Sequence, residues 1–175
     1  MRGGEGNGKM GNEPRVPVTG GCLCGAIRYE STKPPNLVGF CHCRMCQKAS
    51  GGLFLVFADF PGGGFRFTSG EPQYYRSSEI ATRGFCRECG TPIAFQYDGS
   101  SGPAIMVETL DHPEDWPPTW EHSGVESKVP WFEISDDLPQ TTTEESGFLK
   151  TAREREASSG SQDSPPPVGP PIRQS

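Results

Sequence analysis

Residues 86–90 read Cys86-Arg87-Glu88-Cys89-Gly90, a Cys-x-x-Cys-Gly segment of the kind that forms one half of a zinc site. In such a turn the backbone brings both sulfurs onto one metal ion and points amide N–H groups at them. The residue after the second cysteine takes a positive φ that a side chain would penalise, and Gly90 meets that need. One pair supplies half of a tetrahedral shell, so two more sulfurs must come from elsewhere in the chain.

The first cysteine cluster, Gly-Cys-Leu-Cys-Gly at residues 21–25, can supply them. Alternate residues of a β-strand face the same side, so a strand here would present both thiols to one metal, and the flanking glycines leave room for close approach. Unpaired core cysteines or a disulfide are the alternatives. We therefore predict a closed structural zinc site with four thiolate ligands: Cys22, Cys24, Cys86 and Cys89.

The middle cluster, Cys-His-Cys-Arg-Met-Cys at residues 41–46, places three thiols within six residues, one ligand short of a closed shell. Structural zinc sites are filled by four protein ligands, whereas catalytic sites keep three and leave one position for water or substrate. Cys41, Cys43 and Cys46 are therefore predicted to hold a second, catalytic zinc ion. A structural zinc completed by His42 or another side chain, and a redox-active Cys-x-x-Cys, are the alternatives. On extended backbone His42 would point away from the two cysteines beside it.

Short β-like runs separated by turn residues predict a mostly β, antiparallel fold. Glycine-rich or polar turns separate the runs, and apolar side chains alternate with polar ones at 27–29 and 65–67. The run at 53–57 is apolar throughout and is predicted to be a central strand covered on both faces, with a short buried helix as the alternative. The predicted runs are 16–18, 26–30, 37–40, 53–57, 65–68, 73–76, 93–97 and 104–109.

The two ends of the chain differ in composition from its middle. Residues 1–15 have almost no apolar side chain and are expected to form a disordered leader. Residues 16–138 form the single predicted zinc-binding domain. Residues 139–175, rich in Pro, Ser and Gly, are expected to form a disordered tail. Glu, Arg, Leu and Ala at 148–157 favour a short helix within it, but this stretch lacks a sustained apolar face.

Charge and hydropathy limit the classes of partner. The chain has a net charge of −6, and residues 16–138 carry nine Lys/Arg against 15 Asp/Glu, so nucleic acid is not an expected partner. Neither an apolar run of membrane-spanning length nor a secretory signal is evident, and we expect a soluble, cytoplasmic protein that does not bind membranes. Cysteines in a reducing compartment favour metal ligation over disulfides.

Four segments resemble the glutathione-dependent formaldehyde-activating enzyme family, which also includes centromere protein V. They are GGCLCGAIRYE (20–30), CHCRMCQKASGG (41–52), GFCRECGTPI (84–93) and VPWFEISDDLP (129–139), so the resemblance runs from about residue 16 to 139. It implies a zinc-bound fold of the β-tent type with two zinc ions per chain. It also implies the same division of the cysteines, with Cys22, Cys24, Cys86 and Cys89 on a structural zinc and Cys41, Cys43 and Cys46 on a catalytic one.

The activity that the resemblance implies is that of a carbon-sulfur lyase. Glutathione and formaldehyde combine reversibly to give S-hydroxymethylglutathione, so the implied partners are a small-molecule thiol and an aldehyde. Arg44, Lys48 and Arg83 are candidate contacts for glutathione, although exposed charges of this kind are ordinary surface residues. A non-catalytic interaction module stabilised by zinc is the alternative function.

Overall fold

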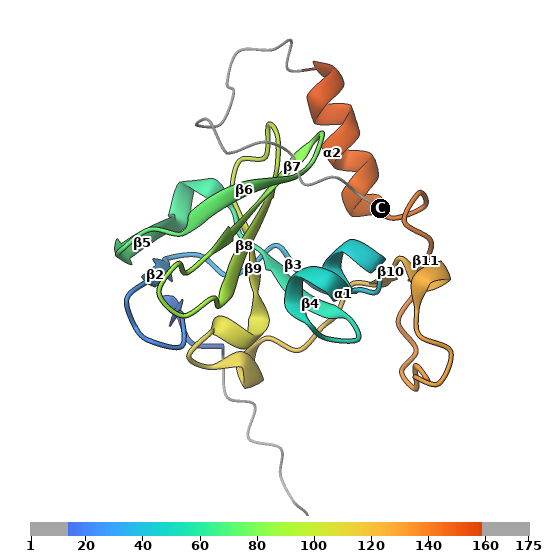
Figure 1. The fold of residues 1–175 in the computed structure, drawn as a ribbon, viewed down its shortest axis with the longest axis horizontal. Coiled ribbons are helices and arrows are strands. Elements are labelled where there is room, and N and C mark those ends of the chain that lie inside the picture. Colours follow the sequence, from blue (N-terminus) through green and yellow to red (C-terminus); the bar gives the residue numbers. More distant parts are fainter. Residues whose placement is uncertain (1–13, 159–175) are drawn as a thin grey trace, which may run out of the picture.

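The computed structural model describes residues 14–158, and Figure 1 shows two β-sheets with few helices. The prediction of a mostly β fold is confirmed. The larger sheet has eight strands in the order β11 (Gln140–Thr141), β10 (His122–Ser123), β3 (Leu37–Cys41), β4 (Leu55–Asp59), β9 (Ala104–Met106), β8 (Pro92–Tyr97), β7 (Ala81–Phe85) and β6 (Gln73–Ser78). The smaller sheet has three, in the order β1 (Val18–Gly21), β2 (Arg28–Ser31) and β5 (Phe65–Ser69).

Neighbouring strands run antiparallel except at one edge of the larger sheet. There β10 lies parallel to both β3 and β11. Two α-helices are present among the described residues, α1 (Arg44–Ser50) and α2 (Gly147–Ser158). Four single turns of 3₁₀-helix complete the described elements: η1 (Gly62–Gly64), η2 (Val107–Thr109), η3 (Pro113–Asp115) and η4 (Val125–Ser127).

Strand β4 is central and contributes apolar side chains to both faces of the larger sheet, as predicted, although it begins at Leu55, two residues after the start of the predicted run 53–57. Val56 and Ala58 belong to the core between the two sheets, whereas Leu55 and Phe57 belong to a second cluster on the opposite face. This follows from the period of two along a strand. The larger sheet therefore has one face toward the smaller sheet and the other toward the site described below.

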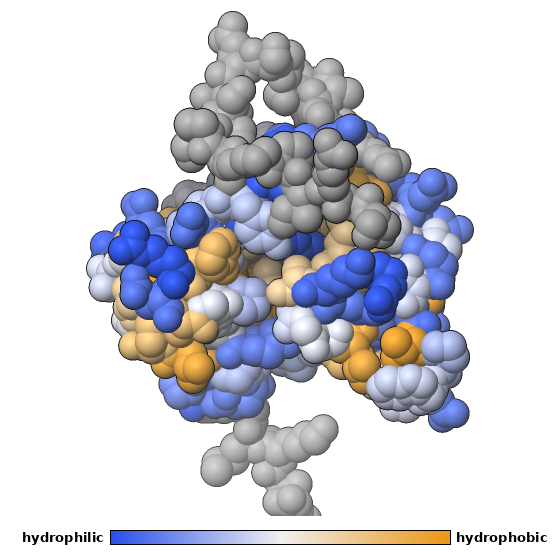
Figure 2. Space-filling view, viewed as in Figure 1, coloured by the Kyte–Doolittle hydropathy of each residue, from blue (hydrophilic) through white to orange (hydrophobic). Residues whose placement is uncertain are grey.

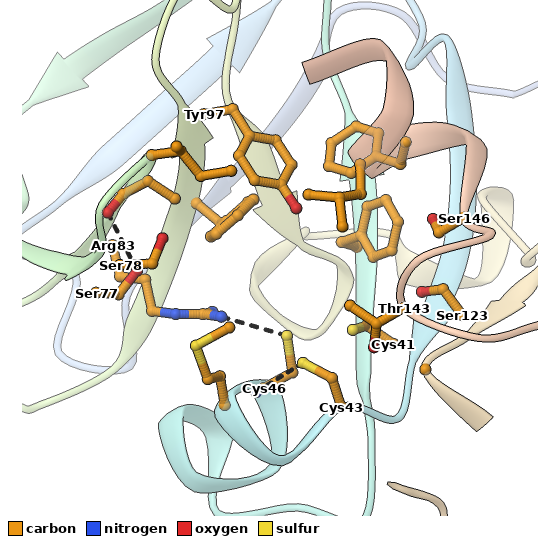
Figure 3. Close-up of a pocket in the computed structure, with 18 of the residues that line it drawn as sticks. Cys41, Cys43, Cys46, Ser77, Ser78, Arg83, Tyr97, Ser123, Thr143 and Ser146 are labelled. Atoms are coloured by element: carbon orange, nitrogen blue, oxygen red, sulfur yellow. Dashed lines mark hydrogen bonds between the residues drawn. The ribbon is translucent and has the colours of Figure 1, made fainter. Parts of the chain in front are cut away.

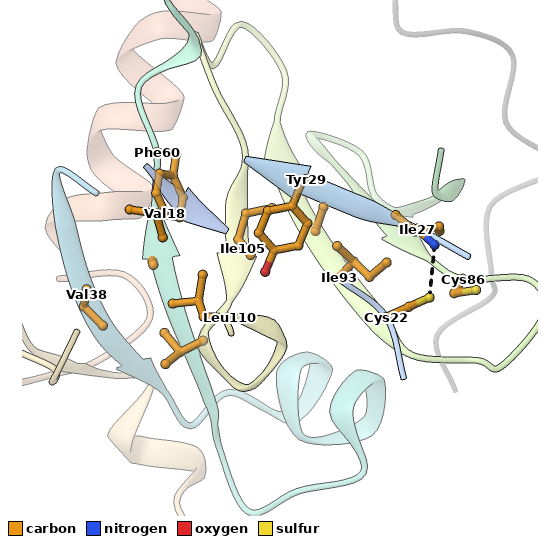
Figure 4. Packing of buried hydrophobic residues seen from close by; sticks show 13 residues of the cluster. Val18, Cys22, Ile27, Tyr29, Val38, Phe60, Cys86, Ile93, Ile105 and Leu110 are labelled. Carbon is orange, nitrogen blue, oxygen red and sulfur yellow. Dashed lines mark hydrogen bonds between the residues drawn. The ribbon is translucent and has the colours of Figure 1, made fainter. Parts of the chain in front are cut away.

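The core between the sheets is built from aliphatic side chains together with Phe60 and Tyr29 (Figure 4). Tyr29 is 1% exposed, and its hydroxyl lies 2.7 Å from the Thr109 hydroxyl, so the one polar atom of this ring has a partner inside the core. Cys22 and Cys86 lie at the edge of the same cluster, beside Ile27 (Figure 4). The four-cysteine group is thus continuous with the main hydrophobic core.

The chain after residue 139 differs from the predicted tail. Residues 140–158 carry β11 and α2, and Leu149 is buried, so the prediction of disorder is wrong for this stretch. The Phe148 ring packs 5.1 Å from that of Phe57 and 5.4 Å from that of Tyr97, centroid to centroid. One apolar pair held by distant rings therefore orders a helix that lacks a continuous apolar face. Residues 1–13 of the predicted leader and 159–175 of the predicted tail lie outside the described residues.

On the face shown in Figure 2, the described residues form separate apolar patches among hydrophilic ones. Within residues 14–158, neither α-helix has the length and hydropathy needed to cross a lipid bilayer.

Candidate functional site

The seven cysteines gather into two groups, and the larger one has the geometry of a tetrahedral metal site. The sulfurs of Cys22, Cys24, Cys86 and Cys89 all lie within 4.8 Å of one another, and none forms a disulfide. The Cys22 and Cys24 sulfurs are 3.5 Å apart, and those of Cys24 and Cys86 are 3.8 Å apart. Four sulfurs placed tetrahedrally around zinc at ~2.3 Å would be roughly 3.8 Å apart. The group therefore fits zinc in both donor type and spacing.

Two glycine-ended turns bring these four sulfurs together. Gly90 has φ 76° and its amide donates to the Cys86 carbonyl at 2.8 Å, as the knuckle sequence predicted. Cys22 and Cys24 do not lie on a strand, because β1 ends at Gly21. A second turn follows, in which Gly25 has φ 77° and donates to the Cys22 carbonyl at 3.0 Å. The expected convergence of thiols is correct, but a turn produces it.

Neighbouring donors favour the thiolate form of two of these cysteines. The Thr91 hydroxyl lies 3.1 Å from Cys89 Sγ and lowers the pKa of this thiol to about 6. Burial opposes ionisation of Cys22, but the Ile27 amide donates to its sulfur at 3.2 Å, and the net effect is a lowered pKa. Zinc binds the thiolate form, so both contacts favour metal binding.

The second group consists of Cys41, Cys43 and Cys46, whose sulfurs also lie within 4.8 Å of one another. Cys41 ends β3, and Cys46 lies in the first turn of α1. Cys43 is the N-cap of α1, and its sulfur accepts a hydrogen bond from the Cys46 amide at 3.4 Å. The end of a central strand and the start of a short helix therefore position the three thiols.

Mutual hydrogen bonding makes these three thiols unequal. Hydrogen bonds from Cys41 and Cys46 lower the pKa of Cys43 far below that of an ordinary thiol, and the hydrogen bond with Cys43 raises the pKa of Cys41. One thiolate shared by three sulfurs is the natural starting point for metal binding, which releases the remaining protons.

Arg83 of β7 supplies the positive charge beside this group. It is 6% exposed, its guanidinium donates to Cys46 Sγ at 3.3 Å, and the same group lies 4.8 Å from the centroid of the Phe95 ring. Burial alone would lower the pKa of Arg83, but the charge and hydrogen bond of Cys46 outweigh it, and the net shift is upward. This residue, expected as an ordinary surface charge, is a buried neighbour of the sulfurs. The other two candidate contacts, Arg44 and Lys48, are exposed and do not line the cavity described below.

Among the side chains that the structure describes, no fourth His, Cys, Asp or Glu joins the three sulfurs. His42 is fully buried and directs Nε2 toward His122 Nδ1 at 2.9 Å, and His122 Nε2 lies 3.0 Å from an oxygen of Asp136. The carboxylate favours a proton on His122 Nε2, so His122 Nδ1 accepts from His42. The His42 side chain therefore contacts His122 and is not a ligand of the three-sulfur group. This agrees with its predicted direction away from the sulfurs.

A cavity of about 650 Å³ opens over the three sulfurs (Figure 3). Its size is typical of a small-molecule site. Figure 3 shows the Tyr97 hydroxyl directed into the space and the Arg83 side chain reaching Cys46 at its base. Beyond the three cysteines the lining residues come from α1, the larger sheet, the loop after β6, the segment 123–124 and α2 with the residues before it: Met45, Phe57, Ser77, Ser78, Glu79, Ile80, Ala81, Arg83, Phe95, Tyr97, Ser123, Gly124, Thr143, Ser146, Phe148 and Leu149.

The sequence did not single out most of this lining. Phe148 follows residue 139, where a tail was expected, and Gly124 supports Cys43 from a distant part of the chain. A Cβ on Gly124 would lie 2.8 Å from the Cys43 amide nitrogen. Contacts between residues so far apart in sequence have no local signature, and the positive φ of Gly124 is visible only in the structure.

Comparisons with known proteins identify the family of this chain. The family model described as glutathione-dependent formaldehyde-activating enzyme matches residues 17–123. A protein of Schizosaccharomyces pombe named as an uncharacterized lyase is 31% identical over 89 residues, which are 50% of this chain. The aligned region spans 63% of that relative's length.

A crystal structure of a Rhodobacter sphaeroides protein is also similar, with 21% sequence identity and a TM-score of 0.43. The match covers 53% of this chain and 87% of that protein, and a score this low does not by itself establish a shared fold. The family match covers more than half of the chain and includes all seven cysteines. The chain therefore belongs to the glutathione-dependent formaldehyde-activating enzyme family.

Proposed function

We propose that this chain is a zinc-dependent carbon-sulfur lyase of the formaldehyde-activating type, acting on a thiol–aldehyde adduct such as S-hydroxymethylglutathione. Within the β-tent fold that the resemblance implies, Cys22, Cys24, Cys86 and Cys89 would hold a structural zinc. Cys41, Cys43 and Cys46 would hold a catalytic one. The observation that carries the proposal is a three-sulfur group, without a fourth protein ligand in the described chain, at the base of a cavity of about 650 Å³.

The reaction needs no oxidant and no second substrate in the cleavage direction. In an adduct R–S–CH₂–OH, the hydroxyl proton leaves, a C=O bond forms, and the C–S electron pair passes to sulfur, which is released as the thiol. A zinc ion held by three thiolates supplies a vacant position that stabilises a substrate thiolate or polarises a carbonyl oxygen. Three anionic ligands weaken the second effect, which favours stabilisation of the thiolate.

The residues around the sulfurs have separate tasks in this scheme. Arg83 offsets part of the negative charge of the three thiolates through its contact with Cys46. Burial raises the pKa of Tyr97, so its phenol stays protonated and offers an O–H donor inside the cavity. A hydroxyl or carbonyl oxygen of the adduct is a suitable acceptor for that donor.

Metal content measured together with the rate of formaldehyde loss tests the proposal. The purified protein should contain two zinc ions per chain and should consume formaldehyde faster when a thiol is present. Two zinc ions without any thiol-dependent rate would overturn the lyase proposal. Cobalt substitution gives a second measurement, because a thiol entering the vacant position changes the visible spectrum of the three-sulfur site. An unchanged spectrum would favour the non-catalytic interaction module.

A further inference from the structure

The cavity above the three sulfurs has walls made mainly of aromatic and aliphatic side chains. Phe57, Phe95 and Tyr97 come from the larger sheet, and Phe148 and Leu149 come from α2. The rings contact one another, with centroids 4.7 Å apart for Phe95 and Tyr97 and 5.1 Å apart for Phe57 and Phe148. Such a surface gains most from contact with an apolar group.

Charged groups are few in this lining and are already engaged or exposed. Of the described lining residues only Arg83 and Glu79 carry full charges apart from the thiols. Arg83 is held by Cys46 and by the face of Phe95, and Glu79 is exposed. Glutathione carries two carboxylates and one ammonium group at neutral pH, and the cavity offers no free buried cation to either carboxylate. Desolvating unpaired charges is costly, and the thiolates add repulsion.

The α2 wall is fixed in place by a buried carboxylate. Glu121 is 6% exposed and accepts hydrogen bonds from the hydroxyls of Ser146 at 2.7 Å and Thr141 at 3.1 Å. Ser146 directly precedes α2, so this contact sets where the helix begins. The part of the cavity wall formed by α2 is therefore fixed by the fold, although α2 lies beyond the 17–123 region that matches the family.

From these observations we propose that the thiol half of the substrate carries an uncharged alkyl or aryl group, which packs against Phe148 and the rings of the sheet, in preference to the glutathione tripeptide. The proposal rests on the proposed function, since it concerns the ligand of the same site. It assigns α2 the role of selecting the thiol by size and polarity.

Binding of two thiols to the zinc-loaded full chain tests this selection. We expect isothermal titration calorimetry to give a dissociation constant for benzyl mercaptan at least ~10-fold lower than for glutathione, because one buried ring contributes more than the 1.4 kcal/mol that a factor of ten requires. Phe148→Ala should weaken benzyl mercaptan binding by about 10-fold and leave glutathione binding unchanged. Lys150→Ala, on the same helix but outside the cavity lining, should change neither.

A variant that keeps the apolar wall guards against loss of folding in Phe148→Ala. Phe148→Leu should give a smaller loss of benzyl mercaptan binding, with an unchanged circular dichroism melting curve. Equal or tighter binding of glutathione by the two-zinc protein would overturn the inference and leave the lyase proposal intact. Faster formaldehyde release from the glutathione adduct than from the benzyl adduct would do the same. A protein that binds only one zinc ion would overturn the proposed function, and this inference with it.

Discussion

The guanidinium of Arg83 donates a hydrogen bond to Cys46 Sγ at 3.3 Å, which places a buried positive charge against the three-sulfur group. The substitution Arg83→Met removes this charge and keeps most of the side-chain volume. The thiolates then repel one another without compensation, and we expect zinc affinity at this group to fall by about 10–100-fold. Competition with a chromophoric chelator measures the change.

A surface arginine provides the control for that experiment. Arg66 pairs with Glu30 and is 69% exposed, so Arg66→Met should leave both zinc affinities unchanged. If Arg83→Met released zinc no more readily than Arg66→Met, the charge of Arg83 would have no role at the sulfurs. Arg83→Lys keeps the positive charge but loses the planar guanidinium with its several N–H donors. The zinc affinity of this variant should lie between those of Arg83→Met and Arg66→Met.

The two cysteine groups should lose metal independently. Cys43→Ser removes one of three ligands and should reduce the zinc content from two ions per chain to one, with the protein still folded. Cys22→Ser changes a group that is continuous with the main core and should also lower the melting temperature. Elemental analysis combined with thermal denaturation separates these results. Loss of both ions from Cys43→Ser would contradict independent sites.

Most strands and the grouping of the cysteines could be predicted from the sequence because their signals are local. Alternation and turn residues mark β2 and β5, and paired spacings mark the two cysteine groups. Strand β7 gave no such signal. All but the last of its five residues are buried, including Thr82, Arg83 and Gly84, so neither alternation nor an apolar run is visible. A Cβ on Gly84 would lie 2.8 Å from a ring carbon of Tyr74, so the glycine is required by a neighbouring strand.

The cavity was beyond sequence reasoning because distant contacts build it. Helix α1 has seven residues, too few for a periodic pattern, and its limits come from the Cys43 cap and from Gly51 at φ 73°. Helix α2 is held by Phe148 against two strands, a contact between parts of the chain at least fifty residues apart. The sequence predicted three sulfurs with a vacant position, whereas the apolar walls above them depend on tertiary packing.

An ion pair joins the smaller sheet to the chain after η2 and should make stability depend on pH. Hydrogen bonds from Arg28 and Thr19 to Asp111 lower the pKa of this carboxyl. A lowered pKa in the folded state stabilises the fold above the unfolded pKa of about 3.9, and this stabilisation is lost as pH falls through the folded value. Asp111→Asn should therefore melt earlier than the parent at pH 7, and the difference should shrink below pH ~4.

Comparing the two proteins at each pH controls for acid release of the metal, which affects both. The pair of Glu30 with Arg66 has a more exposed arginine, 69% against 40% for Arg28, and should contribute less. A difference in melting temperature that stayed constant from pH 7 to pH 3 would show that ionisation of Asp111 is not its cause.

Gly124 should be essential to the three-sulfur group for a steric reason. Its φ is 70°, and a Cβ there would lie 3.1 Å from the Cβ of Cys43. Gly124→Ala should cost about 1 kcal/mol for the backbone alone and should also displace Cys43, so that this group loses tight zinc binding. Gly51 has a similar φ of 73°, but a Cβ added there would meet no other atom within 4 Å. Gly51→Ala should therefore lower the stability through backbone strain alone and leave the zinc content unchanged. Equal zinc content in the two variants would refute the steric argument.

The attachment of α2 through Glu121 can be tested without any substrate. Glu121→Ala removes the acceptor of the Ser146 and Thr141 hydroxyls, so α2 should detach more often and expose Lys150 to trypsin. The expected result is faster cleavage at Lys150 with an unchanged zinc content. Glu126→Ala removes an exposed carboxylate that accepts from Thr143 and serves as the control. Equal cleavage rates in the two variants would mean that the ring contacts of Phe148 alone hold the helix, in which case Phe148→Ala should release it.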